Sequence, residues 1–88
     1  MLCLITYDLK LERDYSKLYE AIKNLGVCWR HLRSVWIVKS TYDPKTIANY
    51  LRKFIDEDDK LFVVDITGKE KDGWLDKQAW DWFTTNNV

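Results

Sequence analysis

Cysteine and histidine are scarce in this chain of 88 residues, which has two cysteines and one histidine. Cys3 and Cys28 lie in apolar, strand-like stretches, a setting typical of reduced thiols in the core of a cytoplasmic protein. No group of cysteines and histidines has the spacing of a zinc site, because His31 stands alone. The sequence therefore predicts neither a disulfide scaffold nor a structural zinc centre.

Long apolar runs are also lacking. No stretch approaches the roughly 20 apolar residues of a membrane span, and the first residues do not have the charged start and small-residue cleavage site of a signal peptide. A single proline and a hydrophobic fraction of 47% exclude a disordered chain. We expect one folded, cytoplasmic protein that does not enter a membrane.

The chain also lacks an excess of charge of one sign. Fourteen Lys and Arg residues balance fourteen Asp and Glu residues, so net charge does not indicate a nucleic-acid-binding protein. Basic side chains could still form one local patch if the strands bring them together. The candidate members of this patch are Lys10, Arg13, Arg30, Arg33 and Lys39.

Tryptophan, by contrast, is abundant, with five residues in the chain. So small a core does not need this much aromatic bulk, and tryptophan is enriched at protein interfaces. Three of the five lie in the tail, as Trp74, Trp80 and Trp82. We expect these three side chains at an interface.

The first eight residues organise the rest of the chain. Residues 2–5 are apolar at every position, which predicts a strand buried on both faces in the middle of a sheet. Asp8 follows where this strand reaches the rim of the sheet. A carboxylate there is held rigidly and can still meet solvent, a partner or a metal ion. Asp8 is therefore the candidate catalytic and metal-binding residue, and the alternative is an aspartate that only caps the following loop.

The remaining chain alternates helical and strand patterns. Asp14 is predicted to cap the first helix and Gly26 to end it in a left-handed conformation, while Asp43 and Pro44 mark the start of the second helix. The four acidic residues 56–59 lack the spacing of a calcium loop and are predicted to form a solvated turn. The predicted elements are a strand at 2–7, a helix at 15–25, strands at 27–32 and 35–38, a helix at 44–55, a strand at 60–66 and a short helix at 76–83, followed by a frayed end at 84–88.

The stretch 27–38 predicts two antiparallel strands joined by a tight turn or bulge at Arg33 and Ser34, although a single bent strand would also fit. Strict alternation places Trp29 on one face of the first of these strands, and Cys28 and Leu32 together on the other.

The element order β-α-β-β-α-β is that of the ferredoxin-like fold, an α+β architecture with a four-stranded antiparallel sheet and both helices on one face. We expect this domain over residues 1–67 and a C-terminal aromatic extension over residues 68–88, packed on the domain or on a dimer partner. The strand at 60–66 is apolar on both faces, which suits a central position, whereas this topology places it at an edge. An edge strand of this kind needs a cover, and a homodimer joined across the open sheet face would supply one.

Several short motifs resemble known families. Tyr7-Asp8 at the end of the first strand, Gly26 after the first helix and the step Ser34-Val35-Trp36 resemble the small CRISPR-associated adaptation and endoribonuclease family. The VapD toxins, which share that fold, are also similar. The tail, with Gly73-Trp74-Leu75 and the run 79–82, is similar to a bacterial and phage group labelled SinR-like.

The resemblance implies a homodimer built sheet to sheet, with the two copies of Asp8 facing each other near the two-fold axis. In a nuclease, such a pair would hold one Mg²⁺ ion that polarises a phosphate and generates the attacking hydroxide. Members of the family often follow this aspartate with a run of basic residues. Here two acidic residues, Glu12 and Asp14, interrupt the basic ones, which argues against strong catalysis.

Three functions are consistent with these patterns. The first is a dimeric protein associated with DNA or RNA, weakly or not catalytic, that contacts phosphates through Lys10, Arg13, Arg30 and Arg33. The second is a Mg²⁺-dependent nuclease that uses Asp8. The third is a protein-binding module whose aromatic tail docks a partner, as small phage effectors do. Fold alone does not choose among them.

Overall fold

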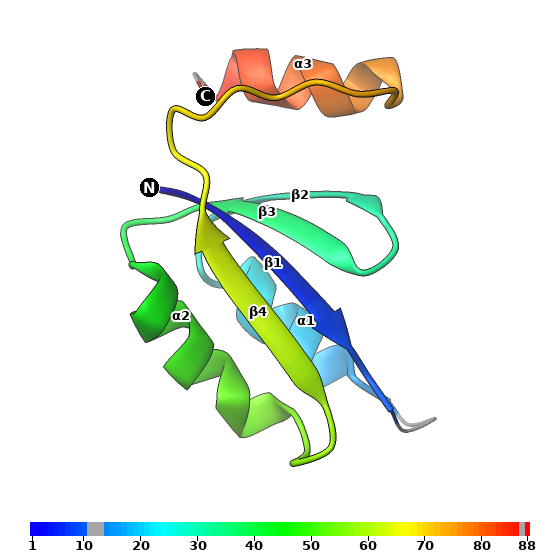
Figure 1. The fold of residues 1–88 in the computed structure, drawn as a ribbon, viewed down its shortest axis with the longest axis vertical. Helices are drawn as coiled ribbons and strands as arrows, with labels where there is room; N and C mark the ends of the chain where they lie inside the picture. Colours follow the sequence, from blue (N-terminus) through cyan, green and yellow to red (C-terminus); the bar gives the residue numbers. More distant parts are fainter. Residues whose placement is uncertain (11–13, 87) are drawn as a thin grey trace.

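The chain forms one four-stranded antiparallel sheet with helices on both faces, in a computed structural model that describes residues 1–10, 14–86 and 88 (Figure 1). The predicted α+β, ferredoxin-like order is confirmed, and a helical extension follows it. The elements are β1 (Leu2–Asp8), α1 (Ser16–Lys23), β2 (Val27–Leu32), β3 (Val35–Lys39), α2 (Pro44–Leu51), the 3₁₀ helix η1 (Arg52–Phe54), β4 (Lys60–Asp65) and α3 (Lys77–Thr85).

β1 is a central strand, as predicted, in a sheet of order β2-β3-β1-β4. It pairs with β3 from Leu2 opposite Lys39 and with β4 as far as Asp8 opposite Lys60. β4 lies at the edge, so the central position suggested by its apolar pattern is wrong. That pattern reports whether the two faces of a strand are apolar, and it does not report whether another strand lies beside it.

The inner face of the sheet, which carries α1 and α2, holds the larger core. Cys3 and Ile5 point inward from β1 and are fully buried. The helices contribute apolar residues at helical spacing, among them Leu18 and Ile22 from α1 and Ile47 from α2. Burial raises the pKa of the Cys3 and Cys28 thiols, and both cysteines are free, as expected.

Helix capping was predicted correctly for α2 and incorrectly for α1. The Asp43 carboxylate accepts a hydrogen bond from the Thr46 amide (2.8 Å), and this bond lowers the pKa of Asp43. In α1 the N-cap position belongs to Tyr15, and Asp14, one residue earlier, accepts a hydrogen bond from the Ser16 amide (2.8 Å). The carboxylate therefore shapes the turn that leads into α1 and does not cap the helix itself.

Gly26 does not have the left-handed backbone that was predicted, since the glycines with positive φ are Gly68 and Gly73. α1 ends at Asn24, in a right-handed conformation. A Cβ atom at position 26 would instead collide with the Lys39 carbonyl oxygen. Glycine is needed here because the chain leaving α1 passes directly against the backbone of β3.

β2 and β3 form the predicted hairpin, with its turn at Arg33 and Ser34. A register shift between Trp29 and Leu32 places Leu32 opposite Val35, on the same face as Trp29. The strict alternation expected for this strand is therefore wrong at Leu32. The shift adds an apolar side chain to the outer face, the sheet face opposite α1 and α2.

α3 covers part of the outer face, near the end where β1 begins (Figure 1). Ala79 and Phe83 of α3 are buried against Leu2, Trp29 and Ile37 of the sheet. The Trp29 indole N–H donates a hydrogen bond to the Ala79 carbonyl oxygen (3.1 Å), and the Trp29 and Phe83 rings stack with centroids 5.8 Å apart. The sheet thus has a second, smaller core on the face that a two-layer ferredoxin-like fold leaves open.

The end of the chain, predicted to fray, is anchored instead. The Lys39 ammonium group donates a hydrogen bond to the Asn86 carbonyl oxygen (2.7 Å). The Val88 amide donates another to the Phe83 carbonyl oxygen (3.0 Å). The first bond ties the end of α3 to β3, and the second holds Val88 against α3.

Fewer tryptophan side chains are left outside the core than the composition suggested. Trp29 and Trp36 are each 2% exposed, and Trp80 and Trp82 are half-buried around the α3 core. Trp74 is fully exposed. In the described parts of the chain, no helix has the length and apolar character that crossing a membrane requires.

Replacing Phe83 by alanine tests how much α3 contributes to the fold. Phe83 is 6% exposed, and truncating a buried phenylalanine costs about 3–5 kcal/mol of unfolding free energy. We therefore expect Phe83→Ala to lower the urea midpoint strongly. Trp74→Ala, at the fully exposed site, is the matched control and should unfold like the wild type. Equal midpoints for Phe83→Ala and the wild type would show that α3 is only an appendage.

Candidate nucleic-acid interface

Asp8 lies at the last position of β1 and on the outer face, where a rigid central strand carries its carboxylate into solvent. Its side chain is 70% exposed. The nearest described charge is the Lys10 ammonium group, whose nitrogen lies 3.8 Å from a carboxylate oxygen of Asp8. The position matches the prediction of a strand-end carboxylate that a ligand can reach.

Lys60 is a second basic neighbour of Asp8 that the sequence analysis missed. The two residues are direct partners across β1 and β4, so their side chains leave the sheet on the same face, a short distance apart. Lys60 also follows four acidic residues in sequence, which hides it from any search for basic runs. Only the pairing of the first and last strands of the sheet reveals it.

The predicted basic patch is divided by the strand register. Thr6 pairs with Val35, so the β2–β3 turn that carries Arg33 reaches the Asp8 end of the sheet, where Lys10 and Lys60 also lie. Lys39 pairs with Leu2 at the opposite end, and its ammonium group is bonded to the tail. Including Lys39 in the patch was therefore wrong, because antiparallel strands separate it from the others. Arg13 lies outside the described residues.

Arg30 is held by aromatic rings on the inner side of the sheet. Its guanidinium carbon lies 4.6 Å from the centroids of both the Tyr19 and the Trp36 rings, a cation–π arrangement. The guanidinium group also donates hydrogen bonds to the Tyr7 hydroxyl (3.4 Å) and the Arg33 carbonyl oxygen (3.3 Å). Arg30 thus supports the β2–β3 turn, and its guanidinium group lies on the opposite face of the sheet from Asp8 and Lys60.

The Tyr7 hydroxyl joins this cluster to the residue before Asp8. It accepts a hydrogen bond from the Trp36 indole N–H (3.0 Å). Burial raises the pKa of Tyr7, although the bond from Trp36 and the nearby Arg30 act in the opposite direction. Tyr7 therefore stays protonated at neutral pH and fixes the end of β1 from the inner side.

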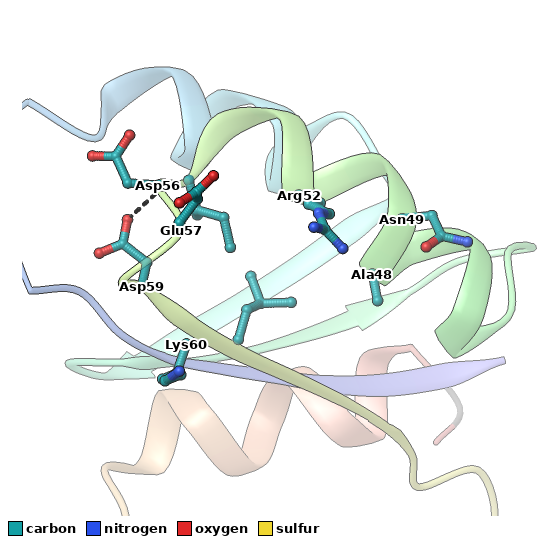
Figure 2. Close-up of a pocket in the computed structure, with 9 residues that line it drawn as sticks. Ala48, Asn49, Arg52, Asp56, Glu57, Asp59 and Lys60 are labelled. Atoms are coloured by element: carbon teal, nitrogen blue, oxygen red, sulfur yellow. Dashed lines mark hydrogen bonds between the residues drawn. The ribbon is translucent and has the colours of Figure 1, made fainter.

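The prediction that residues 56–59 form a solvated turn is wrong at Asp59. The residue is 6% exposed, and its carboxylate accepts hydrogen bonds from the Tyr15 hydroxyl, the Lys10 amide and the Asp56 amide. Figure 2 shows this corner between the end of α2 and β4, with Asp59 on the helix side of the strand and Lys60 on the other side. A run of four acidic residues gives no indication that one of them is buried, because two of its hydrogen-bond donors, Lys10 and Tyr15, come from distant segments.

A scan against protein-family models matches residues 1–73 to the family described as CRISPR associated protein Cas2. The match covers most of the chain and includes the whole sheet, α1, α2 and Asp8. The chain belongs to the Cas2 family. No match was found among curated protein sequences.

Helix α3 (Lys77–Thr85) lies outside the part of the chain that matches the Cas2 family model. The family match confirms the resemblance to the CRISPR-associated family for the sheet and its two inner helices. The similarities to the VapD toxins and to the SinR-like group remain predictions.

A Mg²⁺ ion, which the resemblance to a nuclease family implies, does not fit the residues of a single chain at Asp8. Among the described residues, no group of three or more His, Cys, Asp and Glu side chains could hold a metal ion. Asp8 offers one carboxylate, and the ammonium group of Lys10 lies beside it (3.8 Å). Mg²⁺ binds through one or two carboxylates plus water and phosphate oxygens. Because the Lys10 ammonium group offsets the charge of the single Asp8 carboxylate, a metal site would need the Asp8 of a second copy as well.

The tail tryptophans line different surfaces. Trp80 borders a groove of about 340 Å³ between α3, the segment 69–73 and the outer face, together with apolar residues such as Leu4 and Leu32. Trp74 directly follows this segment and is fully exposed, while Trp82 packs edge-on against Phe83. Of the three predicted interface residues, Trp74 is the one whose whole side chain is accessible to a partner.

Proposed function

We propose that this Cas2-family chain is a cytoplasmic homodimer that associates with DNA or RNA and has weak or no catalytic activity. The nucleic-acid contact lies at the Asp8 end of the outer face, where Lys10, Arg33 and Lys60 present their charges to phosphates. Membership of a CRISPR-associated family supports a nucleic acid as the partner. Phosphate contacts by lysine and arginine provide most of the affinity of such proteins and do not depend on base sequence.

One observation carries this proposal: Asp8 has basic neighbours where a metal site would need acidic ones. Lys10 lies 3.8 Å away, and Lys60 is its direct partner on β4. In a metal site these ammonium groups would repel the cation that the carboxylate attracts. Facing a phosphate backbone, the same two lysines supply favourable charge and offset the repulsion from Asp8.

The homodimer is supported by the apolar surface that α3 leaves uncovered. On the outer face Phe62 is 61% exposed and Leu32 is 47% exposed. Leu4, Val35 and Val64, also on this face, are only half-buried. A second copy docked here would cover these side chains and bring the two Asp8 ends together. The extension 68–88 would lie at the rim of this interface, with Trp74 available for contact.

A Mg²⁺-dependent nuclease is the second candidate, and the exposure of Asp8 on a rigid strand favours it. Two copies of Asp8 across a two-fold axis would supply the two carboxylates that one chain lacks. The groove beside Trp80 favours a third candidate, in which the aromatic tail binds a protein partner.

Replacing Lys60 by glutamine tests the phosphate contact directly. Each lysine–phosphate contact contributes about 0.9 to the slope of log affinity against log salt for duplex DNA, and about 0.7 for single strands. We expect Lys60→Gln to make this slope less steep by about 0.9 for duplex DNA, or about 0.7 for single strands, for each copy of Lys60 that contacts a phosphate. The slope is measured by fluorescence anisotropy with mixed-sequence oligonucleotides. The matched control is Lys45→Gln, at the start of α2, which should leave the slope unchanged. Equal slopes for Lys60→Gln and the wild type would remove Lys60 from the interface.

Replacing Asp8 by asparagine distinguishes the binding protein from the nuclease. Asparagine keeps the shape of the side chain and removes its charge. A phosphate-binding role predicts that Asp8→Asn binds oligonucleotides as tightly as the wild type or more tightly, because one repulsion is gone. Cleavage of labelled RNA and DNA is followed in parallel with Mg²⁺ present. Robust cleavage by the wild type that Asp8→Asn abolishes would establish the nuclease instead.

A further inference from the structure

Asp59 is a buried carboxylate that connects three separate segments of the chain. One of its oxygens accepts hydrogen bonds from the Lys10 amide (2.9 Å) and the Tyr15 hydroxyl (3.0 Å). The other accepts from the Asp56 amide (2.8 Å) and from the same hydroxyl (3.1 Å). The bond to Lys10 spans 49 positions of sequence. Asp59 therefore joins the chain leaving β1 to the start of α1 and to the turn before β4.

The Lys10 bond is the one with a consequence for the Asp8 end of the sheet. Lys10 stands two residues after Asp8, beyond the last pair that β1 makes with β4. The ion pair between the two side chains is 3.8 Å long and more than half exposed. Exposed pairs of this kind contribute little to stability and are screened by salt. Side-chain attraction alone cannot fix where the Lys10 ammonium group stands.

The partly buried hydrogen bond from the Lys10 amide to the Asp59 carboxylate is held more firmly than the exposed ion pair. Asp59 is also adjacent in sequence to Lys60, the other basic neighbour of Asp8. The Asp59 carboxylate thus holds the backbone of Lys10. Lys60 takes its position relative to Asp8 from the pairing of β4 with β1, so Lys10 is the lysine whose place depends on Asp59.

We propose that Asp59 is a positioning residue that sets the place of Lys10 beside Asp8 and so shapes the phosphate-binding end of the sheet. This inference rests on the proposed function only for its effect on binding. The effect on the Lys10 backbone can be measured in the free protein.

The test uses Asp59→Asn in the full chain. Asparagine has one acceptor oxygen in place of two and an NH₂ group that cannot accept, so the hydrogen bonds from Lys10, Tyr15 and Asp56 cannot all be kept. Two controls separate positioning from stability. Tyr15→Phe removes a hydroxyl from the same carboxylate but leaves the Lys10 bond. Asp43→Asn removes one negative charge at the α2 cap, away from Lys10.

The first readout is amide hydrogen exchange at Lys10, measured by NMR and divided by the exchange of the β1 amides. The division removes any general loss of stability, which raises both. We expect this ratio to rise about tenfold in Asp59→Asn and to stay at the wild-type value in both controls. An unchanged ratio in Asp59→Asn, or an equal rise in Tyr15→Phe, would overturn the proposal. If Asp59→Asn does not fold, Asp59→Glu, which keeps the charge but displaces it, is measured with the same expectation.

The second readout is the affinity for a fluorescein-labelled, mixed-sequence single-stranded RNA. We expect Asp59→Asn to bind this RNA several-fold more weakly than Asp43→Asn does. A raised Lys10 exchange ratio with unchanged RNA affinity would show that positioning does not serve binding, and that part of the proposal would fall. If the wild type itself does not bind the RNA, the proposed function fails, while the exchange ratio still decides whether Asp59 positions Lys10.

Discussion

The central strand β1 is apolar on both faces, so both faces of the sheet must be shielded from water. On the inner face α1 and α2 bury Cys3 and Ile5. On the outer face α3 covers Leu2, and this cover is confined to the end of the sheet where β1 begins. Each fully buried aliphatic or aromatic side chain contributes about 1.5–3 kcal/mol, a large share of a typical domain stability of about 5–15 kcal/mol. The rest of the structure depends on how completely this second face is covered.

Partial cover by α3 also determines where a ligand or partner can approach. The chain uses its own C-terminal helix at one end of the outer face and leaves Phe62, Leu32 and Asp8 accessible toward the other. The part of the chain that matches the Cas2 family model ends at residue 73, before α3 begins. The family fold therefore provides the sheet and Asp8, while a segment beyond the matched part limits the open surface. The proposed phosphate contact lies on this open surface, where Lys10 and Lys60 are basic neighbours of Asp8.

The sequence was informative wherever the deciding interaction is local. β1 and the Asp43 cap of α2 were predicted because apolar runs and capping residues act within a few positions of the chain. Residues whose role depends on distant segments were missed. Gly26 is required by the backbone of β3, Asp59 is buried by donors from Lys10 and Tyr15, and Lys60 becomes a neighbour of Asp8 only through the β1–β4 pairing. The same limit explains Lys39, which was grouped with basic residues that the strand register places at the other end of the sheet.

Sedimentation velocity of the purified wild-type chain, alone and with labelled RNA in the presence of Mg²⁺, tests the central claim most directly. The account predicts a species of twice the 10.6 kDa chain mass that carries the RNA with it and leaves the RNA at full length. A chain that sediments as a monomer, or RNA recovered as fragments, would contradict it.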